Sequence, residues 1–363
     1  LLKSLGYDIE RNLLQPINEL NLNISISVRT GDTSSYLKKK QSKYPPNFLI
    51  TTPESFALLM SYVNAKEYFN TLKFIIIDEL HNIIHTKRVD LLSLNLSRLN
   101  GFNSNIKKIA LSATIKDSNI SLQYFTNNNA VKVENSEKKK FKVSILSTKS
   151  KIPWFGYMPL YAIKEIYLLI KSHKSSIIFV NTRAQSEYVF QSLWKINKKK
   201  LKISVHHGSL ERDIRKNIEE QMFRGNLNCV IATSSLELGI DWGDIDLVIQ
   251  IGAPKGVSRI IQRIGRSNHN IKSPSKAILV PTNKFEYLEC YAAIQAIKNF
   301  DIEDAPQKKG SLDVLAQHIC GVACSEEFKA KILYNEIIKA YPYKNLKIKT
   351  FYEILNFIKN GGY

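Results

Sequence analysis

The chain has 363 residues, enough for two domains and part of a third, and 44% of them are apolar, which excludes global disorder. It carries 52 Lys and Arg against 32 Asp and Glu, and the formal net charge of +20 favours a polyanionic partner, usually a nucleic acid. A chain that is rich in lysine throughout would show the same excess, so charge alone leaves both explanations open.

Strands and helices alternate in the first part of the chain. Segments with helical spacing separate four short apolar runs that we expect to be strands, at residues 23–28, 47–52, 74–78 and 107–114. Alternation of this kind indicates crossover units around a parallel sheet. Residues 127–150 are polar and rich in lysine, so we place a first domain at residues 1–135 and a linker at 136–150.

A second alternating block, residues 151–304, repeats this pattern. After a helix at about 158–171, we expect five strands, at residues 175–181, 202–207, 228–233, 245–252 and 277–281. From residue 305 the pattern is helical only, so residues 305–363 are expected to begin a smaller third domain. The predicted fold class is α/β, with two tandem parallel-sheet domains followed by the start of a helical domain.

Two acids, Asp78 and Glu79, end a buried strand in the stretch FIIIDELH. Ligands of parallel sheets bind beyond the carboxyl ends of the strands. An Asp there can hold Mg²⁺ through the water shell of the ion, and a neighbouring Glu can orient or deprotonate an attacking water. The same two acids would also suit the start of the next helix as a capping pair, so both interpretations remain open here.

Polar residues follow the other predicted strands as well. They are Thr51, Thr52, Ser112, Thr114, Asn181, Arg183, Thr233, Gly239 and Asp241. A later helix carries Gln262, Arg263 and Arg266, and an Arg from one domain can neutralise charge on a phosphoryl group held by the other. This series suits hydrolysis of a nucleoside triphosphate, although Thr, Asn and Gly are also ordinary residues at the end of a strand.

Two sets of residues raise the alternative of a transition-metal site. His81 and His85 have helical i, i+4 spacing, but the order H-E-x-x-H is absent because Glu79 precedes both. Cys320 and Cys324 lie four apart near His318, and we interpret the two as half-buried thiols of a helix in preference to metal ligands.

The series of motifs resembles superfamily 2 helicases, which have two RecA-like domains. DELH resembles the DExH box, SAT the motif that links hydrolysis to strand movement, and TSSLELGIDWGDID and QRIGRSNH the paired motifs of the second domain. The blocks VRTGDT, PPNFLITTPESFALLM and HHGSLERDIRK resemble the Lhr-like group, and LDVLAQHICGVAC resembles the start of its winged-helix domain. The later LYNEIIKAYPYKNL and the final GGY look most like the ligase-associated DEXH-box branch.

The resemblance implies a role for each matching residue. Asp78 would coordinate Mg²⁺, Glu79 would activate water, and His81 and Gln262 would sense the nucleotide. In the second domain Gly239 and Asp241 would approach the ribose and γ-phosphate, and Arg266 would be the arginine finger, supported by Arg263. Ser112 and Thr114 would couple hydrolysis to movement. The residues that would line the nucleic-acid track are Arg29, Thr51, Thr52, Asn181, Arg183, His207, Gly208 and Thr233.

One motif that ATP hydrolysis needs is absent from the sequence. No G-x-x-x-x-G-K-[ST] loop occurs, and the nearest stretch, GAPKGVS at 252–258, has its Lys on the wrong side of the second Gly. In relatives this loop lies upstream of a motif that LLKSL at residues 1–5 resembles. We expect that both ends are cut and the loop belongs to preceding sequence; the alternative is a gene fragment that no longer hydrolyses ATP.

The resemblance therefore implies an ATP-dependent and Mg²⁺-dependent helicase that moves 3′-to-5′ on single-stranded or tailed duplex DNA in repair, with a ligase or nuclease as a possible protein partner. The alternatives are a catalytically inactive nucleic-acid-binding remnant and an RNA helicase of the same fold. The 4 cysteines lack a C-x-x-C pair, and neither a signal peptide nor a membrane-length apolar run is present, so we expect a cytoplasmic protein.

Overall fold

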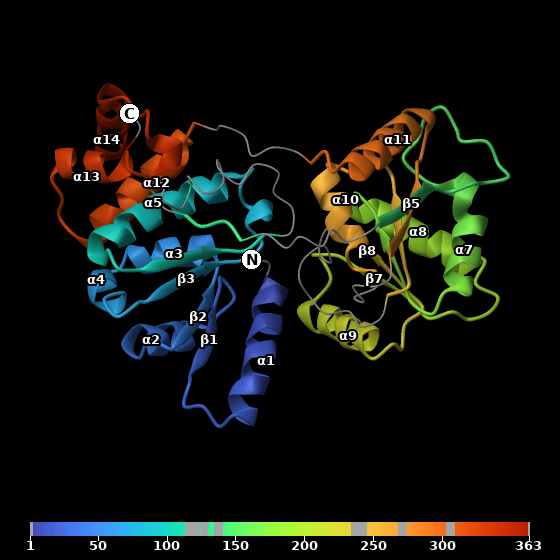
Figure 1. The fold of residues 1–363 in the computed structure, drawn as a ribbon, viewed down its shortest axis with the longest axis horizontal. Helices are drawn as coiled ribbons and strands as arrows, with labels where there is room; N and C mark the ends of the chain where they lie inside the picture. The colour runs from blue at the N-terminus through green and yellow to red at the C-terminus, as the bar shows by residue number, and fades with distance from the viewer. Residues whose placement is uncertain are drawn as a thin grey trace. The chain divides into compact units, whose positions relative to one another are not determined.

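The computed structural model describes residues 3–112, 124, 130–133, 141–233, 245–267, 274–302 and 309–361. The chain forms two compact units (Figure 1). Unit 1 combines residues 1–133 with residues 304–363, and unit 2 comprises residues 134–303.

Short parallel strand pairs form the sheet layer of unit 1. β1 (Ile26–Arg29) pairs with β2 (Phe48–Thr51), and β3 (Phe74–Ile77) pairs with β4 (Lys107–Ala110). Both pairs are parallel, so the carboxyl ends of the two strands in each pair lie at the same edge. The four predicted strands are confirmed, each shorter than the apolar run that predicted it. Thr52, at the end of the second run, caps α3, and the last two residues of the run 107–114 lie outside the described residues.

Helices follow the strands of unit 1, and side-chain caps begin three of them. Ser34, Thr52 and Thr86 each accept a backbone N–H of the first helical turn, which satisfies a donor that would otherwise lack a partner. The helical segments before residue 103 are α1 (Lys3–Glu19), α2 (Ser35–Lys43), α3 (Pro53–Met60), α4 (Ala65–Tyr68), the short η1 (Leu80–Asn82) and α5 (Lys87–Phe102).

The helix α5 has a core on each of two sides. Its residues Val89–Leu99 are all buried. Leu92, Leu96 and Leu99 pack with α3 and β3, whereas Leu91 and Leu94 pack with the C-terminal helices. A helix that is apolar on two faces needs a second layer over it, and the C-terminal segment supplies that layer.

The C-terminal helices pack on α5 within unit 1 (Figure 1). They are α12 (Leu312–Ser325), α13 (Ala330–Ile337), η4 (Tyr341–Tyr343) and α14 (Ile348–Lys359). Arg98 of α5 donates to the carboxylate of Glu326 at 2.8 Å and to Ser325 Oγ, and Asp90 Oδ2 accepts from the backbone N–H of Ser311 at 3.1 Å and from its hydroxyl at 2.8 Å. The segment predicted as a separate domain thus shares a compact unit with residues 1–133, and the predicted domain boundaries stay predictions.

Unit 2 contains a six-stranded parallel sheet with the order β5-β10-β9-β6-β8-β7. Its strands are β5 (Phe141–Ile145), β6 (Ser176–Phe179), β7 (Ile203–His206), β8 (Cys229–Ala232), β9 (Leu247–Ile251) and β10 (Ser275–Val280). The predicted linker 136–150 differs here from the structure, because it contains β5. The alternation Phe-Lys-Val-Ser-Ile places Val143 and its apolar neighbours against the core, which makes this segment an edge strand.

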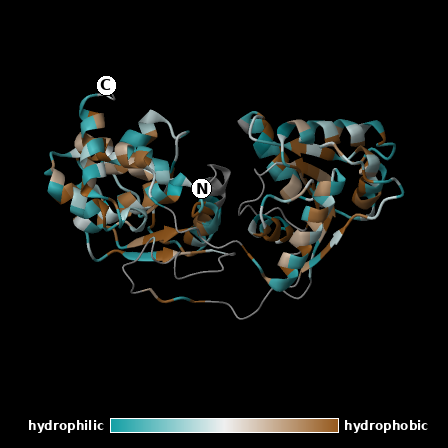
Figure 2. Cartoon of the chain, turned by 90° about the horizontal axis from the view of Figure 1, so that it is seen from above, coloured by the Kyte–Doolittle hydropathy of each residue, from teal (hydrophilic) through white to brown (hydrophobic). Residues whose placement is uncertain are grey.

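Successive residues of β6 point to opposite faces of this sheet, and each face has its own core. Ile177 and Phe179 pack with one set of helices, and Ile178 and Val180 pack with another. The first face is covered by α9 (Arg212–Phe223), α10 (Val257–Ile264) and α11 (Lys284–Asn299), and the second by η2 (Leu160–Ala162), α7 (Ile163–Ser172) and α8 (Arg183–Lys195). Figure 2 shows hydrophobic strands covered by helices whose outer faces are more hydrophilic.

The cysteine and histidine residues of α12 do not converge on one point. His318 is buried, and burial together with the charge of Arg98 lowers its pKa to about 3. Cys320 and Cys324 are exposed, so the prediction that these two thiols are half-buried is wrong. Across the described ranges, no three His, Cys, Asp or Glu side chains gather as a metal site would require. In the same ranges, no helix combines the length and apolar character needed to cross a membrane.

Candidate nucleotide and nucleic-acid sites

The parallel pairing of β3 and β4 brings the DELH and SAT segments to one edge of unit 1. Leu111 N–H donates to Ile77 O at 2.8 Å, and Leu80 N–H donates to Leu111 O at 3.0 Å. The chain that leaves β3 is therefore bonded to the chain that leaves β4. Ser112 lies at this edge, whereas Thr114 lies outside the described residues.

The backbone turns sharply at the two acids. Glu79 has φ +51° and ψ 45°, a left-handed conformation that costs a non-glycine residue about 1–2 kcal/mol. Its N–H donates to Asp78 Oδ1 at 2.8 Å. Glu79 precedes the short helix η1 without a side-chain capping bond, and the cap of α5 is Thr86. Glu79 is therefore not a side-chain cap, whereas the Asp78 carboxylate accepts a backbone N–H at this turn.

His81 connects the two motifs. Its Nε2 lies 3.0 Å from Glu79 Oε2, and its Nδ1 lies 3.0 Å from Ser112 Oγ. The neutral tautomer in which Nε2–H donates to the carboxylate lets Nδ1 accept from the hydroxyl. Asn82 Nδ2 also lies 3.1 Å from Nε2, where the lone pair of the other tautomer would accept from it. His81 is 7% exposed in η1, and His85 is exposed in the turn after it, so no α-helix carries the two imidazoles at the expected spacing.

The carboxylate of Asp78 suits a hydrated Mg²⁺. Asp78 is half-buried, and this burial raises the pKa of its carboxyl; the Glu79 N–H bond opposes the shift, and the Glu79 charge adds to it. Magnesium keeps several waters and binds through one or two carboxylates together with phosphate oxygens. One hard oxygen ligand at the tip of a strand therefore fits Mg²⁺ without the three-ligand cluster that a zinc site would need.

The predicted track residues of unit 1 use their side chains internally. Thr51 Oγ1 donates to Arg29 O at 2.9 Å, and Thr52 caps α3 by accepting from Ser55 N at 3.2 Å. Arg29 is 2% exposed, and its guanidinium donates to groups on α2 and to Tyr62 OH. These side chains shape the edge of the unit, and their direct interaction with nucleic acid stays a prediction.

In unit 2 the strand order places three predicted track residues side by side. Asn181 follows β6, Thr233 follows β8 and His207 follows β7, and these strands are consecutive in the sheet. The connections from β6 and from its neighbour β9 leave in opposite directions along the sheet. Ligands of open parallel sheets bind at the crevice where strand order reverses in this way.

Asn181 spans that crevice. Its Nδ2 donates to Ala253 O at 3.1 Å, and its N–H donates to Gln185 Oε1 at 2.9 Å. Gly252 has φ +79°, and a Cβ there would lie 2.8 Å from Asn181 Nδ2. Neither Gln185 nor Gly252 is among the residues predicted from the sequence. The position of Gly252 directly after a buried strand was a sequence signal that could have identified it. No sequence signal indicates Gln185.

The other predicted residues of this edge differ in exposure. Arg183 is exposed at the start of α8, and Gly208 is exposed with open space around it. His207 is buried, with Nε2 2.8 Å from Glu187 Oε1. Arg183 and Gly208 thus have surfaces that a ligand can reach, whereas His207 is oriented by a carboxylate.

The helix α10 carries the arginines. Arg263 is buried: it donates to Gln250 Oε1, and its guanidinium lies 5.0 Å from the Phe179 ring centroid. Gln262 is also buried, whereas Arg266 follows the helix end at Gly265 and is half-buried. Arg263 therefore fixes α10 to the sheet. Gly239 and Asp241 lie outside the described residues.

Comparison with known proteins identifies the family. Residues 2–122 match the DEAD/DEAH box helicase model, residues 160–270 the helicase conserved C-terminal domain, and residues 295–363 the winged helix domain of the large helicase-related protein. An ATP-dependent helicase Lhr-Core of Methanocaldococcus jannaschii is 38% identical over 377 aligned positions, covering 99% of this chain and 44% of that protein. The chain belongs to the Lhr-like helicases of superfamily 2.

This Lhr-like chain has the fold of its solved relatives. The structure of Mycobacterium smegmatis helicase Lhr bound to ssDNA and AMP-PNP has a TM-score of 0.87 and 31% identity, covering 98% of this chain and 49% of that chain. The DUF1998 helicase MrfA bound to DNA and AMPPNP, at 21% identity and a TM-score of 0.73, shares the fold. The two parallel-sheet regions are thus tandem RecA-like domains, and winged-helix sequence follows them.

The Lhr-like chain spans less than half the length of these relatives. It covers 27% of the Lhr helicase/uracil glycosylase of Escherichia coli, at 28% identity. The resemblance inferred from the motifs is confirmed at the level of the Lhr-like group. The ligase-associated branch within that group stays a prediction.

Proposed function

We propose that the complete protein is an ATP-dependent and Mg²⁺-dependent helicase that moves 3′-to-5′ along single-stranded DNA and acts in DNA repair. The observation that carries this proposal is the series of interactions from Glu79 through His81 to Ser112, with Asp78 beside it. A relative that is 31% identical over 98% of this chain has been solved with ssDNA and AMP-PNP, which supports both ligands.

Unit 1 supplies the groups that act on water and metal. Asp78 would hold a hydrated Mg²⁺, which when bound would supply positive charge to the phosphate oxygens. Glu79 orients and deprotonates the attacking water, and the His81 imidazole fixes the position of the Glu79 carboxylate at a distance of 3.0 Å. These roles depend on the left-handed turn at Glu79, because an ordinary helical turn would direct the Glu79 carboxylate away from His81.

Unit 2 supplies the cation and the sensor. Arg266 neutralises charge that develops on the transferred phosphoryl group, and Gln262 responds to the nucleotide. Arg263 does not reach the nucleotide itself; it holds α10, and therefore Arg266, against the sheet through Gln250. Gly239 and Asp241 complete this side at the ribose and γ-phosphate.

Nucleic acid lies along the strand-tip edges in this proposal. Arg183, Asn181, Gly208 and Thr233 offer a cation, an amide, a backbone and a hydroxyl, groups that bind phosphate and sugar without reading the bases. The net charge of +20 supports a polyanionic partner. The cytoplasm as the site of action, and a ligase or nuclease as a partner, are further parts of the proposal.

The choice of nucleic acid can be tested by measuring ATP hydrolysis of the complete protein with single-stranded DNA and with RNA of the same sequence. Stronger stimulation by DNA is expected, together with unwinding of duplexes that carry a 3′ tail. Equal stimulation by both would contradict the DNA assignment. Strand binding without ATP hydrolysis in the presence of either polymer would favour the inactive remnant instead.

A further inference from the structure

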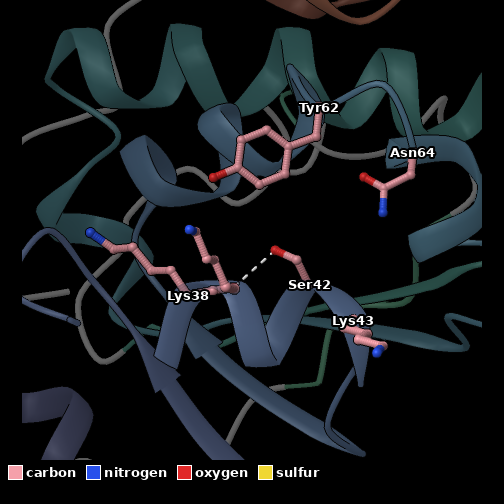
Figure 3. A pocket seen from close by; sticks show the side chains of 6 residues that line it. Lys38, Ser42, Lys43, Tyr62 and Asn64 are labelled. Carbon is pink, nitrogen blue, oxygen red and sulfur yellow. Dashed lines mark hydrogen bonds between the residues drawn. The ribbon is translucent and has the colours of Figure 1, made fainter. Parts of the chain in front are cut away.

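Unit 1 has a pocket outside the strand-tip residues that the motifs predicted. Its volume is about 480 Å³, and it lies between α2 and the segment that follows α3. Figure 3 shows the α2 side chains on one side and Tyr62 and Asn64 on the other. The residues that line it are Lys38, Lys39, Ser42, Lys43, Tyr62 and Asn64.

The charged residues that line this pocket, Lys38, Lys39 and Lys43, are all cationic. Residues 33–53 include no Asp or Glu, while Lys38, Lys39, Lys40 and Lys43 all belong to α2. Within the described ranges no carboxylate pairs with these lysines; the Lys38 ammonium donates to Gly31 O at 3.2 Å. Like charges held close together repel, so the site gains free energy when an anion enters it.

A buried arginine fixes the wall of the pocket. The Arg29 guanidinium donates to Lys38 O at 2.9 Å and to Tyr62 OH at 2.9 Å, which ties α2 to the segment after α3. It also lies 5.6 Å from the centroid of the Tyr62 ring. Because Tyr62 OH accepts from Arg29, its own hydrogen is left to donate to a ligand. The pocket is thus held rigidly and carries a further positive charge behind it.

The donors of the pocket suit a phosphate group. Ammonium groups, the Tyr62 hydroxyl and the Asn64 amide all donate hydrogen bonds, and tetrahedral oxyanions accept several at once. Exposed aromatic rings accompany the lysines: Tyr36 is 75% exposed, Tyr44 is 64% exposed and Tyr62 is 37% exposed. Lysines interleaved with tyrosines are typical of surfaces that hold a nucleic-acid backbone while bases or sugars pack on the rings.

We propose that this pocket binds a backbone phosphate of the nucleic acid, so that α2 forms a second binding surface beyond the strand-tip track. The inference rests on the proposed function for the source of the phosphate. In this account Arg29 is a positioning residue: it reaches the nucleic acid through Tyr62 and α2, which explains how a residue of the VRTGDT block serves binding while its own side chain is buried.

The first test measures equilibrium binding of labelled single-stranded DNA by the complete protein over a salt series of about 50 to 200 mM. The Lys39→Gln/Lys43→Gln double variant is compared with Lys171→Gln/Lys195→Gln. These control lysines are exposed in the last turns of α7 and α8, which place them at the edge of the unit 2 sheet opposite the strand tips.

The pocket variant should bind about five- to tenfold more weakly than the parent at low salt. The slope of log Kd against log salt should fall by about 0.7 for each phosphate that the variant no longer binds. The control variant should keep the parental slope. Equal slopes and equal affinities for the two double variants would overturn the pocket assignment. A parent protein that binds no single-stranded DNA at all would overturn both the pocket assignment and the proposed function.

A second test identifies the source of the phosphate. Lysine acetylation of the parent protein is measured by mass spectrometry in the presence of single-stranded DNA, of RNA or of inorganic phosphate. The three samples have the same ionic strength. Either polymer should protect Lys39 and Lys43 and leave Lys171 unprotected. Protection by inorganic phosphate but by neither polymer would show a free-anion site and contradict the proposal. Tyr62→Phe should also weaken binding, because it removes the hydroxyl that donates to the phosphate and accepts from Arg29; a Tyr62→Phe variant with parental affinity would contradict the proposal.

Discussion

His81 Nδ1 lies 3.0 Å from Ser112 Oγ, so a hydrogen bond joins the DELH segment after β3 to the SAT segment after β4. The other ring nitrogen of His81 lies 3.0 Å from the Glu79 carboxylate. The proposed catalytic carboxylate is therefore connected by one imidazole to the motif that would couple hydrolysis to movement. A shift of either segment changes the environment of the other.

Ser112→Ala should separate hydrolysis from unwinding. The substitution removes one hydrogen bond, worth about 1 kcal/mol, so strand-stimulated ATP hydrolysis should stay within roughly tenfold of the parent. Unwinding per ATP should fall further, because His81 no longer reports the nucleotide state to the SAT segment. Ser61→Ala is the matched control, since that hydroxyl bonds within its own turn, to Leu58 O. If hydrolysis and unwinding fall by the same factor in Ser112→Ala, or if neither falls, Ser112 does not couple the two activities.

Asp78→Asn should stabilise the protein as it removes Mg²⁺-dependent nucleotide binding. Burial raises the pKa of the Asp78 carboxyl, so between its unfolded and folded pKa values the native state binds more protons and stability falls as pH rises. At neutral pH the free energy of unfolding of the parent should therefore be lower than that of the variant, which has no charged carboxylate to bury. Urea unfolding from about pH 4 to 8 measures this difference. A variant that is less stable than the parent at neutral pH would be inconsistent with a strained functional carboxylate.

The same raised pKa predicts the pH dependence of metal binding. Mg²⁺ needs the ionised carboxylate, and a proton competes for it at higher pH than for an ordinary Asp. Affinity for the Mg²⁺ nucleotide should decline as pH falls toward the raised pKa, which titration with a fluorescent nucleotide would detect. Asp78→Asn should bind weakly with no such decline.

Gly252→Ala should destabilise unit 2 and disturb Asn181. The new Cβ would lie 2.8 Å from Asn181 Nδ2, and φ +79° is strained for alanine, so we expect a loss of about 2 kcal/mol and weaker binding of single-stranded DNA. Gly208→Ala is the control for stability, because no atom lies within 4 Å of its Cβ position. Chemical denaturation compares the two. If both variants unfold at the same denaturant concentration, the close packing of Asn181 on Gly252 does not matter.

Arg98→Met should weaken the attachment of the C-terminal helices. Arg98 is buried and bonds Glu326 at 2.8 Å between α5 and α12, so its loss should cost about 2–3 kcal/mol. Arg88→Met removes an exposed pair with Glu54 and should cost under about 1 kcal/mol. Hydrogen exchange in α12 should rise for the first variant and not for the second. Equal exchange in both would show that apolar packing alone holds these helices.

Apolar periodicity was sufficient to predict the parallel strands of both units, because each buried run is bounded by turn residues. It was less informative for β5, where the preceding lysines suggested a linker although the alternation Phe-Lys-Val-Ser-Ile is that of an edge strand. The attachment of α12 to α5 was also not predictable. It depends on the buried polar residues Asp90 and Arg98, whose partners lie more than two hundred positions away in the sequence.

The sequence motifs predict the residues of the candidate site, and their roles stay predictions, whereas the local geometry was not predictable. Nothing in the sequence indicates the left-handed backbone at Glu79, which depends on how the tip of β3 meets that of β4. Arg29 matched a motif that would line the nucleic-acid track, and Arg263 matched one that would support the arginine finger. Both are buried, because each guanidinium finds hydrogen-bond acceptors inside its own unit. Side-chain burial of this kind depends on three-dimensional packing that no motif records.

We propose that Glu79 and Arg266 act on the same phosphoryl group. A double-mutant cycle of Glu79→Gln and Arg266→Ala, measured as strand-stimulated kcat in the complete protein, tests it most directly. Each single variant should lose about 10²–10⁴-fold while still binding nucleotide, and the double variant should lose little more than the worse single one. Losses that multiply, or an Arg266→Ala variant with the parental kcat, would contradict the claim.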